Sequence, residues 1–298
     1  MTLRSKVPPR VLILAAAASL ALATIAASGT PESFRFVILG DRTGEAQPGV
    51  FEAAWREAAA ARPAFVITVG DTIEGLDDRT APTQWREVER ILKPYRRYPL
   101  YLTPGNHDIW SDASERLFRK YAAHPPHYSF DYARAHFTIL DNSRSDELSA
   151  GELSFLENDL RAHAAQPVKF IFSHRPSWLL DVALRNPRSP LHQLARQYGV
   201  RYVIAGHVHQ MLRLDLEGVT YISMASSGGH LRGSQRYADG WFFGLAQVEV
   251  RGTDVDFHIE ELKAPYGEGH ATKPADWGML GLIQRAAGGS WSVGIPVR

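Results

Sequence analysis

Short apolar runs rich in β-branched residues recur along the chain, and most end in glycine or another turn-forming residue. Such runs are typical of strands that are buried on both faces. Early strands are therefore predicted at 34–39, 64–69 and 100–102. Later strands, in a half of the chain that is richer in hairpins, are predicted at 136–140, 168–172, 202–205, 211–216, 219–224, 241–250 and 255–259.

Helical patterns separate the early strands, because apolar residues there repeat every three to four positions. The pattern predicts amphipathic helices over 50–61 and 83–95. A further helix is predicted to begin at Ser149, whose hydroxyl can cap the first turn while Glu152 reaches back to the main chain. The alternation of strands and helices predicts a layered α/β fold.

The composition excludes several classes of protein and several kinds of functional site. A chain of 298 residues that is 45% hydrophobic can bury a large core, which excludes a disordered or collagen-like protein. Its 33 basic and 32 acidic residues give a net charge of +1. A charge this small produces no broad electrostatic field that would attract nucleic acid or an anionic membrane. The absence of cysteine excludes disulfides, thiolate metal sites and a cysteine nucleophile. Any metal ion must therefore be bound by oxygen and imidazole ligands.

The first residues have the pattern of a targeting segment. Arg4, Lys6 and Arg10 precede an apolar, alanine-rich run over 11–27, and small residues close the run. This order predicts a secretory signal peptide over 1–28, and hence a periplasmic or extracellular protein. An uncleaved N-terminal membrane anchor is the alternative, although the run is short for a membrane span, which takes about 20 residues.

The rest of the chain is predicted to contain one domain, over 29–263. No internal repeat or low-complexity linker divides it. The last stretch, 264–298, is rich in glycine, proline and tryptophan and has no clear periodicity. We expect it to form a C-terminal extension, to which the sequence assigns no role.

Side chains that can bind metal follow five of the predicted strands. They are Asp41, Asp71, the triplet Asn106-His107-Asp108, His174 and the triplet His207-Val208-His209. Glycine comes directly before the ligand at four of the five places, as expected where the backbone turns sharply or another group approaches closely. Because ligands of α/β sheets bind beyond the carboxyl ends of the strands, we expect these residues to meet in space.

The chemistry of this set is coherent. Carboxylates, an amide and imidazoles suit Mn, Fe or Zn. Two such ions about 3.5–4 Å apart can clamp the attacking and the leaving oxygen of a phosphoryl displacement, and a shared carboxylate is needed to hold the pair. His207 and His209 alternate in a loop, where they can face different ions, so one imidazole per ion is expected. The sequence therefore predicts a dinuclear metal site.

These motifs, in this order, resemble those of the calcineurin-like metallophosphoesterases. The Gly-Asn-His-Asp and Gly-His-x-His blocks are specific, and the resemblance extends from about residue 34 to at least residue 224. It implies a four-layer architecture in which two mixed β-sheets pack as a sandwich flanked by helices. It also implies that a water or hydroxide bridging two metal ions is the nucleophile.

The resemblance further implies a role for each ligand. By the family's pattern Asp71 bridges both ions, and the first ion is also bound by Asp41 and His209. The second ion is bound by Asn106, His174 and His207. His107 stabilises the transition state or protonates the leaving oxygen, a role usually worth about 10²–10⁴-fold in rate. Asp108 is expected to support its loop.

One position departs from the family pattern. The usual first motif is Asp-x-His, whereas this chain has Asp41-Arg42-Thr43, and threonine is a poor replacement for the missing imidazole. The purple acid phosphatases, a branch of the same superfamily, also lack this histidine and use a tyrosine three residues after the bridging aspartate. Glu74 occupies that offset and could bind the first ion. Protein serine/threonine phosphatases have there an aspartate that orients the catalytic histidine, and orientation of His107 by Glu74 is the favoured alternative.

Three further residues are candidates for binding substrate. Arg42 adjoins a predicted ligand, and its planar guanidinium could contact a phosphate oxygen. Arg175 follows His174, and His230 lies in the loop 226–230; both are expected at the rim of the pocket. The remaining histidines, at positions 124, 127, 136, 163, 192, 258 and 270, are expected to be structural or exposed.

These expectations describe an exported dinuclear metallohydrolase that cleaves phosphate mono- or diesters of small molecules without a covalent phosphoenzyme. The motifs do not specify the substrate, because selectivity comes from loops around the crevice. The main alternative is a noncatalytic phospholigand-binding or scaffold protein of the cell envelope, since the first-motif histidine is missing. A metal-dependent hydrolase of a nonphosphate bond is the second alternative.

Overall fold

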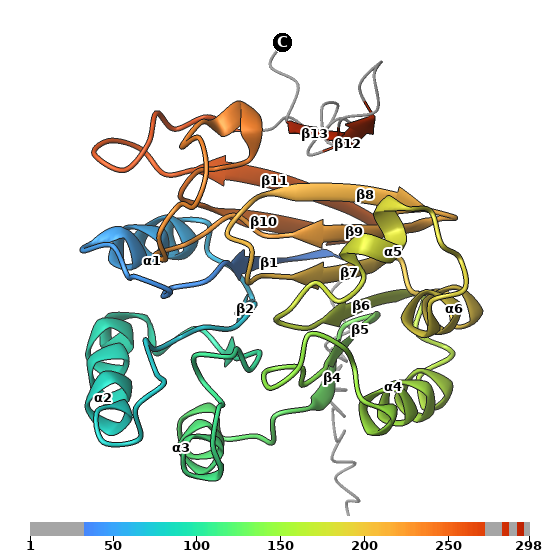
Figure 1. Ribbon diagram of the computed structural model, residues 1–298, viewed down its shortest axis with the longest axis horizontal. Coiled ribbons are helices and arrows are strands. Elements are labelled where there is room, and N and C mark those ends of the chain that lie inside the picture. The colour runs from blue at the N-terminus through green and yellow to red at the C-terminus, as the bar shows by residue number, and fades with distance from the viewer. Residues whose placement is uncertain (1–32, 272–281, 286–290, 295–298) are drawn as a thin grey trace, which may run out of the picture.

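β1, Ser33–Leu39, is apolar along most of its length, and its last four residues are fully buried. A strand buried on both faces needs a layer of side chains above and below it. β1 has both, because it lies inside a sheet that is covered by a second sheet on one face and by a helix on the other (Figure 1). The structure is a computed structural model and describes residues 33–271, 282–285 and 291–294.

Two mixed sheets form the centre of the fold. The first has five strands, in the order β11 Asp254–Glu261, β10 Gly244–Arg251, β1, β2 Phe65–Thr68 and β3 Leu100–Tyr101. The second has six, in the order β4 Tyr128–Tyr132, β5 Ala135–Ile139, β6 Val168–Phe172, β7 Tyr202–Ala205, β9 Val219–Ser223 and β8 Leu212–Leu216. β1, β2 and β3 are parallel, as are β5, β6, β7 and β9, so their carboxyl ends lie at the same edge of each sheet.

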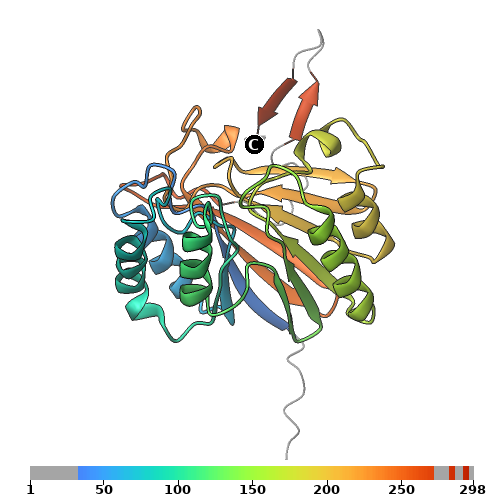
Figure 2. The same cartoon turned by 60° about the horizontal axis from the view of Figure 1, so that its bottom comes forward.

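Helices cover both outer faces of this pair of sheets (Figure 2). On the side of the first sheet lie α1 Val50–Ala60, α2 Ala81–Leu92 and α3 Asp112–Ala122, with a 3-10 turn, η1 Lys93–Tyr95, after α2. On the side of the second lie α4 Ala150–Ala162, α5 Leu179–Ala183 and α6 Pro190–Gln197. The predicted fold class, two mixed sheets packed as a sandwich flanked by helices, is confirmed.

Aromatic rings fill the space between the sheets. Phe36 of β1 stacks on Phe65 of β2, with ring centroids 5.1 Å apart, and meets Phe137 of β5 edge-on at 5.3 Å. Phe137 in turn stacks on Phe170 of β6 at 4.9 Å. Contacts of this kind add to the burial of large apolar surfaces. They fix the spacing of the two sheets and hence the relative position of their carboxyl edges.

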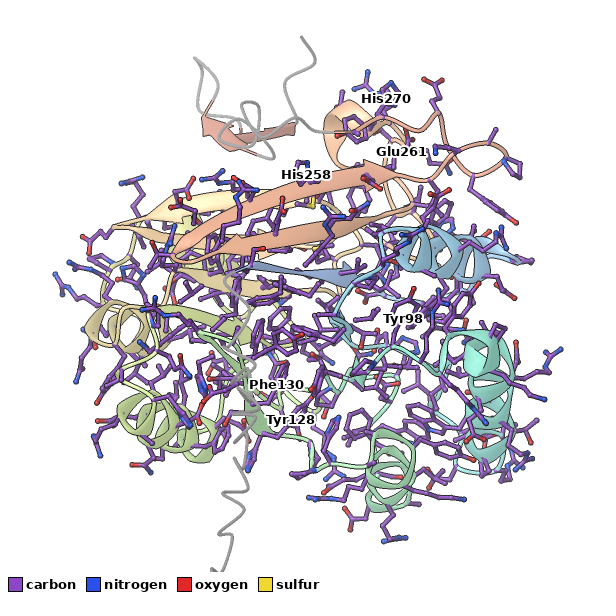
Figure 3. All side chains as sticks on the ribbon, turned by 180° about the vertical axis from the view of Figure 1, so that it is seen from behind. Tyr98, Tyr128, Phe130, His258, Glu261 and His270 are labelled. Atoms are coloured by element: carbon purple, nitrogen blue, oxygen red, sulfur yellow. The ribbon has the colours of Figure 1, made fainter. Side chains whose placement is uncertain are left out.

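β4 is an edge strand that the apolar pattern did not predict. Its side chains alternate, and Tyr128 and Phe130 pack toward the core between the sheets (Figure 3). Phe130 stacks on Tyr101 of β3 at a centroid distance of 3.7 Å, so the edge strands of the two sheets meet there. Ser129 lies on the other face of β4 and bonds to α4.

Most predicted elements are found within one or two residues of their predicted bounds. β10 begins at residue 244 and not at 241, because Phe243 instead forms an isolated bridge to Ser226. Besides β4, the pattern missed the helices α3, α5 and α6. A hairpin of β12 Leu282–Arg285 and β13 Trp291–Gly294 lies in the predicted C-terminal extension.

The predicted signal peptide, 1–28, lies outside the described residues, so it stays a prediction. The boundaries at 263 and 264 stay predictions as well. Within the described part of the chain, no helix has both the length and the apolar character needed to cross a bilayer.

The start of α4 follows the prediction only in part. The Ser149 hydroxyl accepts a hydrogen bond from the main-chain N–H of Glu152, at 3.1 Å, and so caps the first turn. The Glu152 carboxylate does not reach back to complete a capping box. Instead it accepts a hydrogen bond from the main-chain N–H of Asp141 at 2.9 Å and lies 2.6 Å from Nδ1 of His127. The glutamate therefore ties the helix to the loop after β5.

A buried polar cluster joins α4 to β4 and β5. The Asp159 carboxylate accepts hydrogen bonds from Ser129 and Thr138, both at 2.6 Å, and lies 2.8 Å from Nε2 of His136. Burial raises the pKa of Asp159, but these hydrogen bonds outweigh it and hold the pKa below its usual value. Burial likewise lowers the pKa of His136, and Asp159 and Asp131 together raise it above its usual value. The two groups thus form an ion pair at mildly acidic pH.

Asp159→Asn should lower the free energy of unfolding by about 1–3 kcal/mol near pH 6, because it removes the buried one of the two carboxylates that pair with the His136 imidazolium and leaves Asp131 as the other. The raised pKa of His136 means that this stabilisation is complete below about pH 6.5, the ordinary value for histidine, and is lost as the pH rises through the folded-state value. The deficit should therefore shrink toward pH 9. Urea unfolding of both proteins measures it, and a deficit independent of pH would contradict the ion pair.

Candidate metal centre

The predicted ligands come together where the carboxyl ends of the two sheets meet. From the first sheet, Asp41 follows β1, Asp71 follows β2 and Asn106 follows β3. From the second sheet, His174 follows β6, and His207 and His209 follow β7. Contacts between side chains of the first sheet and side chains of the second join the two sets of residues into one site.

The ligands expected for the second ion surround the His174 ring. Its Nε2 lies 2.9 Å from Asn106 Oδ1, 3.1 Å from His207 Nδ1 and 3.2 Å from Asp71 Oδ2. The other ring nitrogen, Nδ1, lies 2.8 Å from the carbonyl oxygen of Val69, which can only accept a hydrogen bond. Nδ1 therefore carries a proton and Nε2 faces the other ligands. Ligand atoms of Asp71, His174 and His207 all lie within 4.8 Å of one another.

The ligands expected for the first ion lie beside this group. Asp41 is fully buried, and its carboxylate accepts the main-chain N–H of His207 at 2.9 and 3.1 Å. Nδ1 of His209 donates to the carbonyl oxygen of His230 at 2.7 Å, which turns Nε2 toward Asp41 Oδ2, 3.3 Å away. This Nε2 is buried and has no hydrogen-bond partner among the described residues. A buried nitrogen lone pair facing a carboxylate fits a metal ion, which would satisfy both groups.

Electrostatics within the site follow from burial and from the paired charges. Burial raises the pKa of Asp71, but the nearby His174 more than offsets this and lowers it to about 2. Burial lowers the pKa of His174, whereas Asp71 raises it to about 9. The pKa of His207 falls to about 4 through burial and the charges of His174 and Arg175. A metal ion held by His174 Nε2 would therefore take the place of a proton.

Three ligand residues have left-handed backbone conformations, which side chains other than glycine rarely adopt. The φ angles are +54° at Asp71, +68° at His207 and +64° at His209. Such conformations cost about 1–3 kcal/mol each and persist where the surrounding structure enforces them. They aim these side chains toward the site.

Glycines next to the ligands leave room for groups from other strands. A β-carbon on Gly105 would stand 2.1 Å from Oδ1 of Asp71, and one on Gly206 would stand 2.4 Å from Oδ1 of Asp41. Real β-carbons do not approach other atoms so closely. The glycines that precede Asn106 and His207 are therefore required by the carboxylates they face.

Asp108 holds two of the ligand loops together. Its carboxylate accepts the main-chain N–H groups of Thr72 at 2.8 Å and of Gly105 at 2.9 Å. Burial, reinforced by the charge of Asp71, raises the pKa of Asp108 to about 7. The expectation that it supports its loop agrees with these contacts.

Asn142 is a positioning residue that the sequence analysis missed. Its Oδ1 accepts the main-chain N–H groups of His174 at 3.1 Å and of Arg175 at 3.0 Å, and its amide nitrogen donates to the carbonyl oxygen of Arg175. It fixes the loop that carries His174. Its position just after a predicted strand, like that of the other site residues, is the signal that could have identified it.

His107 is oriented by Glu74, but through a different atom from the one expected. Nδ1 of His107 lies 2.6 Å from the main-chain carbonyl oxygen of Glu74, and its main-chain N–H donates to Asp71 Oδ1 at 2.9 Å. The Glu74 carboxylate instead accepts the main-chain N–H of Ala46 at 2.6 Å and of Glu45 at 3.3 Å. The carboxylate thus anchors the loop after Asp41, and the contact to the His107 ring is made by the main-chain carbonyl oxygen of Glu74; ligation of a metal ion by the carboxylate stays a prediction.

Arg42, one of the three substrate candidates, has partners other than the one expected. Its guanidinium donates to the carbonyl oxygen of Thr72 at 3.1 Å and to Glu87 of α2 at 3.3 Å, and it lies over the ring of Phe51. These contacts join the ligand loops to the helices, so the expected phosphate contact has no support in the geometry. Neighbouring Thr43, in place of the family's histidine, is fully buried.

The other two candidates lie at the site. Arg175 pairs with Asp146, and its charge is close enough to lower the pKa of His207. His230 contributes its carbonyl oxygen, which orients His209, so its main chain has a positioning role. Contact of either side chain with substrate stays a prediction.

Comparisons with known proteins agree with this geometry. A model of the calcineurin-like phosphoesterases matches residues 34–211. Human tartrate-resistant acid phosphatase type 5 is 25% identical over 272 residues, which cover 74% of this chain and 80% of that protein. A 3',5'-cyclic adenosine monophosphate phosphodiesterase of Escherichia coli is 29% identical over 204 residues, which cover 64% of this chain and 70% of that protein.

A solved structure shares the fold. The purple acid phosphatase of yellow lupin superposes with a TM-score of 0.60 at 16% identity, over 82% of this chain and 52% of the lupin chain, so this chain spans about half of its length. The family model covers more than half of the present chain. The chain belongs to the calcineurin-like phosphoesterase family and is a metal-dependent phosphoester hydrolase.

Proposed function

We propose that this protein hydrolyses phosphate mono- or diesters of small molecules at a site that holds two ions of Mn, Fe or Zn. The observation that carries the proposal is the buried, unpartnered Nε2 of His209 beside Asp41, next to the four-residue group around His174. Two ions bound there would lower the pKa of a water and clamp the attacking and leaving oxygens of the phosphoryl group. Asp71 belongs to the group around His174, 3.2 Å from its Nε2, and following the family's pattern we assign it as a ligand of both ions.

The chain's own residues supply the remaining chemistry. His107 is held beside Asp71 by its main-chain N–H, and its Nδ1 is bonded to the Glu74 carbonyl oxygen. Nε2 is then the ring nitrogen available to a substrate. A proton on this atom can pass to the leaving oxygen as the ester bond breaks. No side chain is needed as a nucleophile, so we expect no covalent phosphoenzyme.

Both ester classes have support among the relatives, since one is named as an acid phosphatase and another as a cyclic-nucleotide phosphodiesterase. The noncatalytic alternative is not favoured, because the missing histidine leaves the four ligands around the second ion in place and His107 oriented beside them. The nonphosphate alternative is not favoured either, since the family is one of phosphoesterases.

The purified protein should hydrolyse aryl phosphates or bis-aryl phosphates when Mn, Fe or Zn is supplied, and chelation should abolish turnover. His107→Asn should lower kcat by about 10²–10⁴-fold without changing the metal content, because it removes the proton donor and no ligand. His127→Asn is the matched control, since this ring bonds to Glu152 on α4. Absence of turnover with every metal would refute the proposal and favour a binding protein.

Glu74→Gln should keep both metal ions and lower kcat by less than about tenfold, because the carbonyl oxygen that orients His107 is unchanged. The loss of charge weakens only the bonds to the loop at Ala46. Metal analysis and steady-state kinetics measure the two effects. Loss of one metal ion per chain would instead make this carboxylate a ligand and overturn the assignment.

We also propose that the protein is exported, on the basis of the basic, apolar and small-residue order in 1–28. Expression of the full sequence in a bacterium should place the protein outside the cytoplasm with a new N-terminus near residue 29. Fractionation and N-terminal sequencing measure this, with replacement of the basic residues before the apolar run as the matched control. An intact protein in the cytoplasmic fraction would contradict export, and an intact one in the membrane fraction would indicate an anchor.

A further inference from the structure

An exposed arginine, Arg232, lies beside the ligands of the first ion. Its Nη2 is 3.5 Å from the point where a β-carbon on Gly44 would stand, and Nε2 of His209 is 3.4 Å from the same point. The guanidinium and the nitrogen that faces the metal position therefore both border the space next to Gly44. The segment that carries Arg232 is held close to Gly44, because the main-chain N–H of His230 donates to the carbonyl oxygen of Gly44 at 3.0 Å.

Arg232 also differs from its neighbours in having no acidic partner among the described residues. Arg42 pairs with Glu87, Arg175 with Asp146 and Arg236 with Asp239, whereas no carboxylate in the described ranges pairs with Arg232. Its fork of donors is therefore available to an anion.

We propose that Arg232 binds a phosphate oxygen of the substrate on the side of the first ion, and that it favours phosphomonoesters over diesters. The inference rests on the proposed function and names its substrate class. A monoester has three unesterified phosphate oxygens and about two negative charges near neutral pH, whereas a diester has two such oxygens and one charge. A guanidinium beside the first ion therefore binds a monoester more strongly than a diester, because it can form charge-assisted hydrogen bonds to the additional oxygen.

The test compares the metal-loaded wild type with Arg232→Ala and Arg232→Lys. For an aryl phosphate, Arg232→Ala should lower kcat/KM by about 10- to 100-fold, the effect expected for a lost hydrogen bond to a charged group. For a bis-aryl phosphate the change should stay within about threefold, and Arg232→Lys should restore part of the monoester activity. Arg236→Ala, in the same loop, is the matched control because that residue pairs with Asp239.

Equal losses for the two substrates, no loss for either, or a wild type that prefers the diester would each overturn the inference. Metal analysis accompanies each variant, and a loss of metal in Arg232→Ala would show a structural role and overturn it too. If the wild type hydrolyses neither substrate, the proposed function fails. Calorimetric titration with inorganic phosphate then still tests the arginine, because Arg232→Ala should weaken phosphate binding by a similar factor, and unchanged binding would refute its contact with phosphate.

Discussion

The attraction between Asp71 of the first sheet and His174 of the second is the interaction on which the site depends. Both side chains are buried, and charged groups are stable there only when they are paired and hydrogen-bonded. Their atoms lie 3.2 Å apart, and the aromatic core between the sheets holds the two carboxyl edges that carry them against each other. The hydrophobic core thus sets the geometry of the polar site.

Several local features that position the ligands lower the stability of the fold. Left-handed backbone at Asp71, His207 and His209 is unfavourable for side chains of this kind, and glycine weakens the ends of strands. These features occur together at the places where ligands from different strands approach. The side-chain oxygens of Asp108 and Asn142 compensate, because they accept hydrogen bonds from main-chain N–H groups and so fix the peptide groups of the ligand loops. Precise positioning is therefore built from residues that do not bind metal.

Much of this could be predicted from the sequence, because buried parallel strands produce apolar runs and their ligands follow directly. The elements that were missed give weaker patterns. α3 begins at a Ser111–Ser114 capping box without a glutamate, and β4 is an edge strand with alternating polar residues. The contacts of individual atoms were harder to predict. The position of Glu74, three residues after Asp71, indicated that it lies near His107, but not that its main-chain carbonyl oxygen makes the contact. Arg232 lies in a loop of low apolar content, where nothing in the sequence indicates that it is near His209.

The central claim is that side chains from both sheets form one cage for a pair of metal ions. Anomalous diffraction from crystals of the metal-loaded protein tests it most directly. We predict two peaks at the meeting edges of the sheets, one beside Asp41 and His209, the other among Asn106, His174 and His207, with Asp71 between them. A single peak, or peaks bound to other residues, would contradict the account.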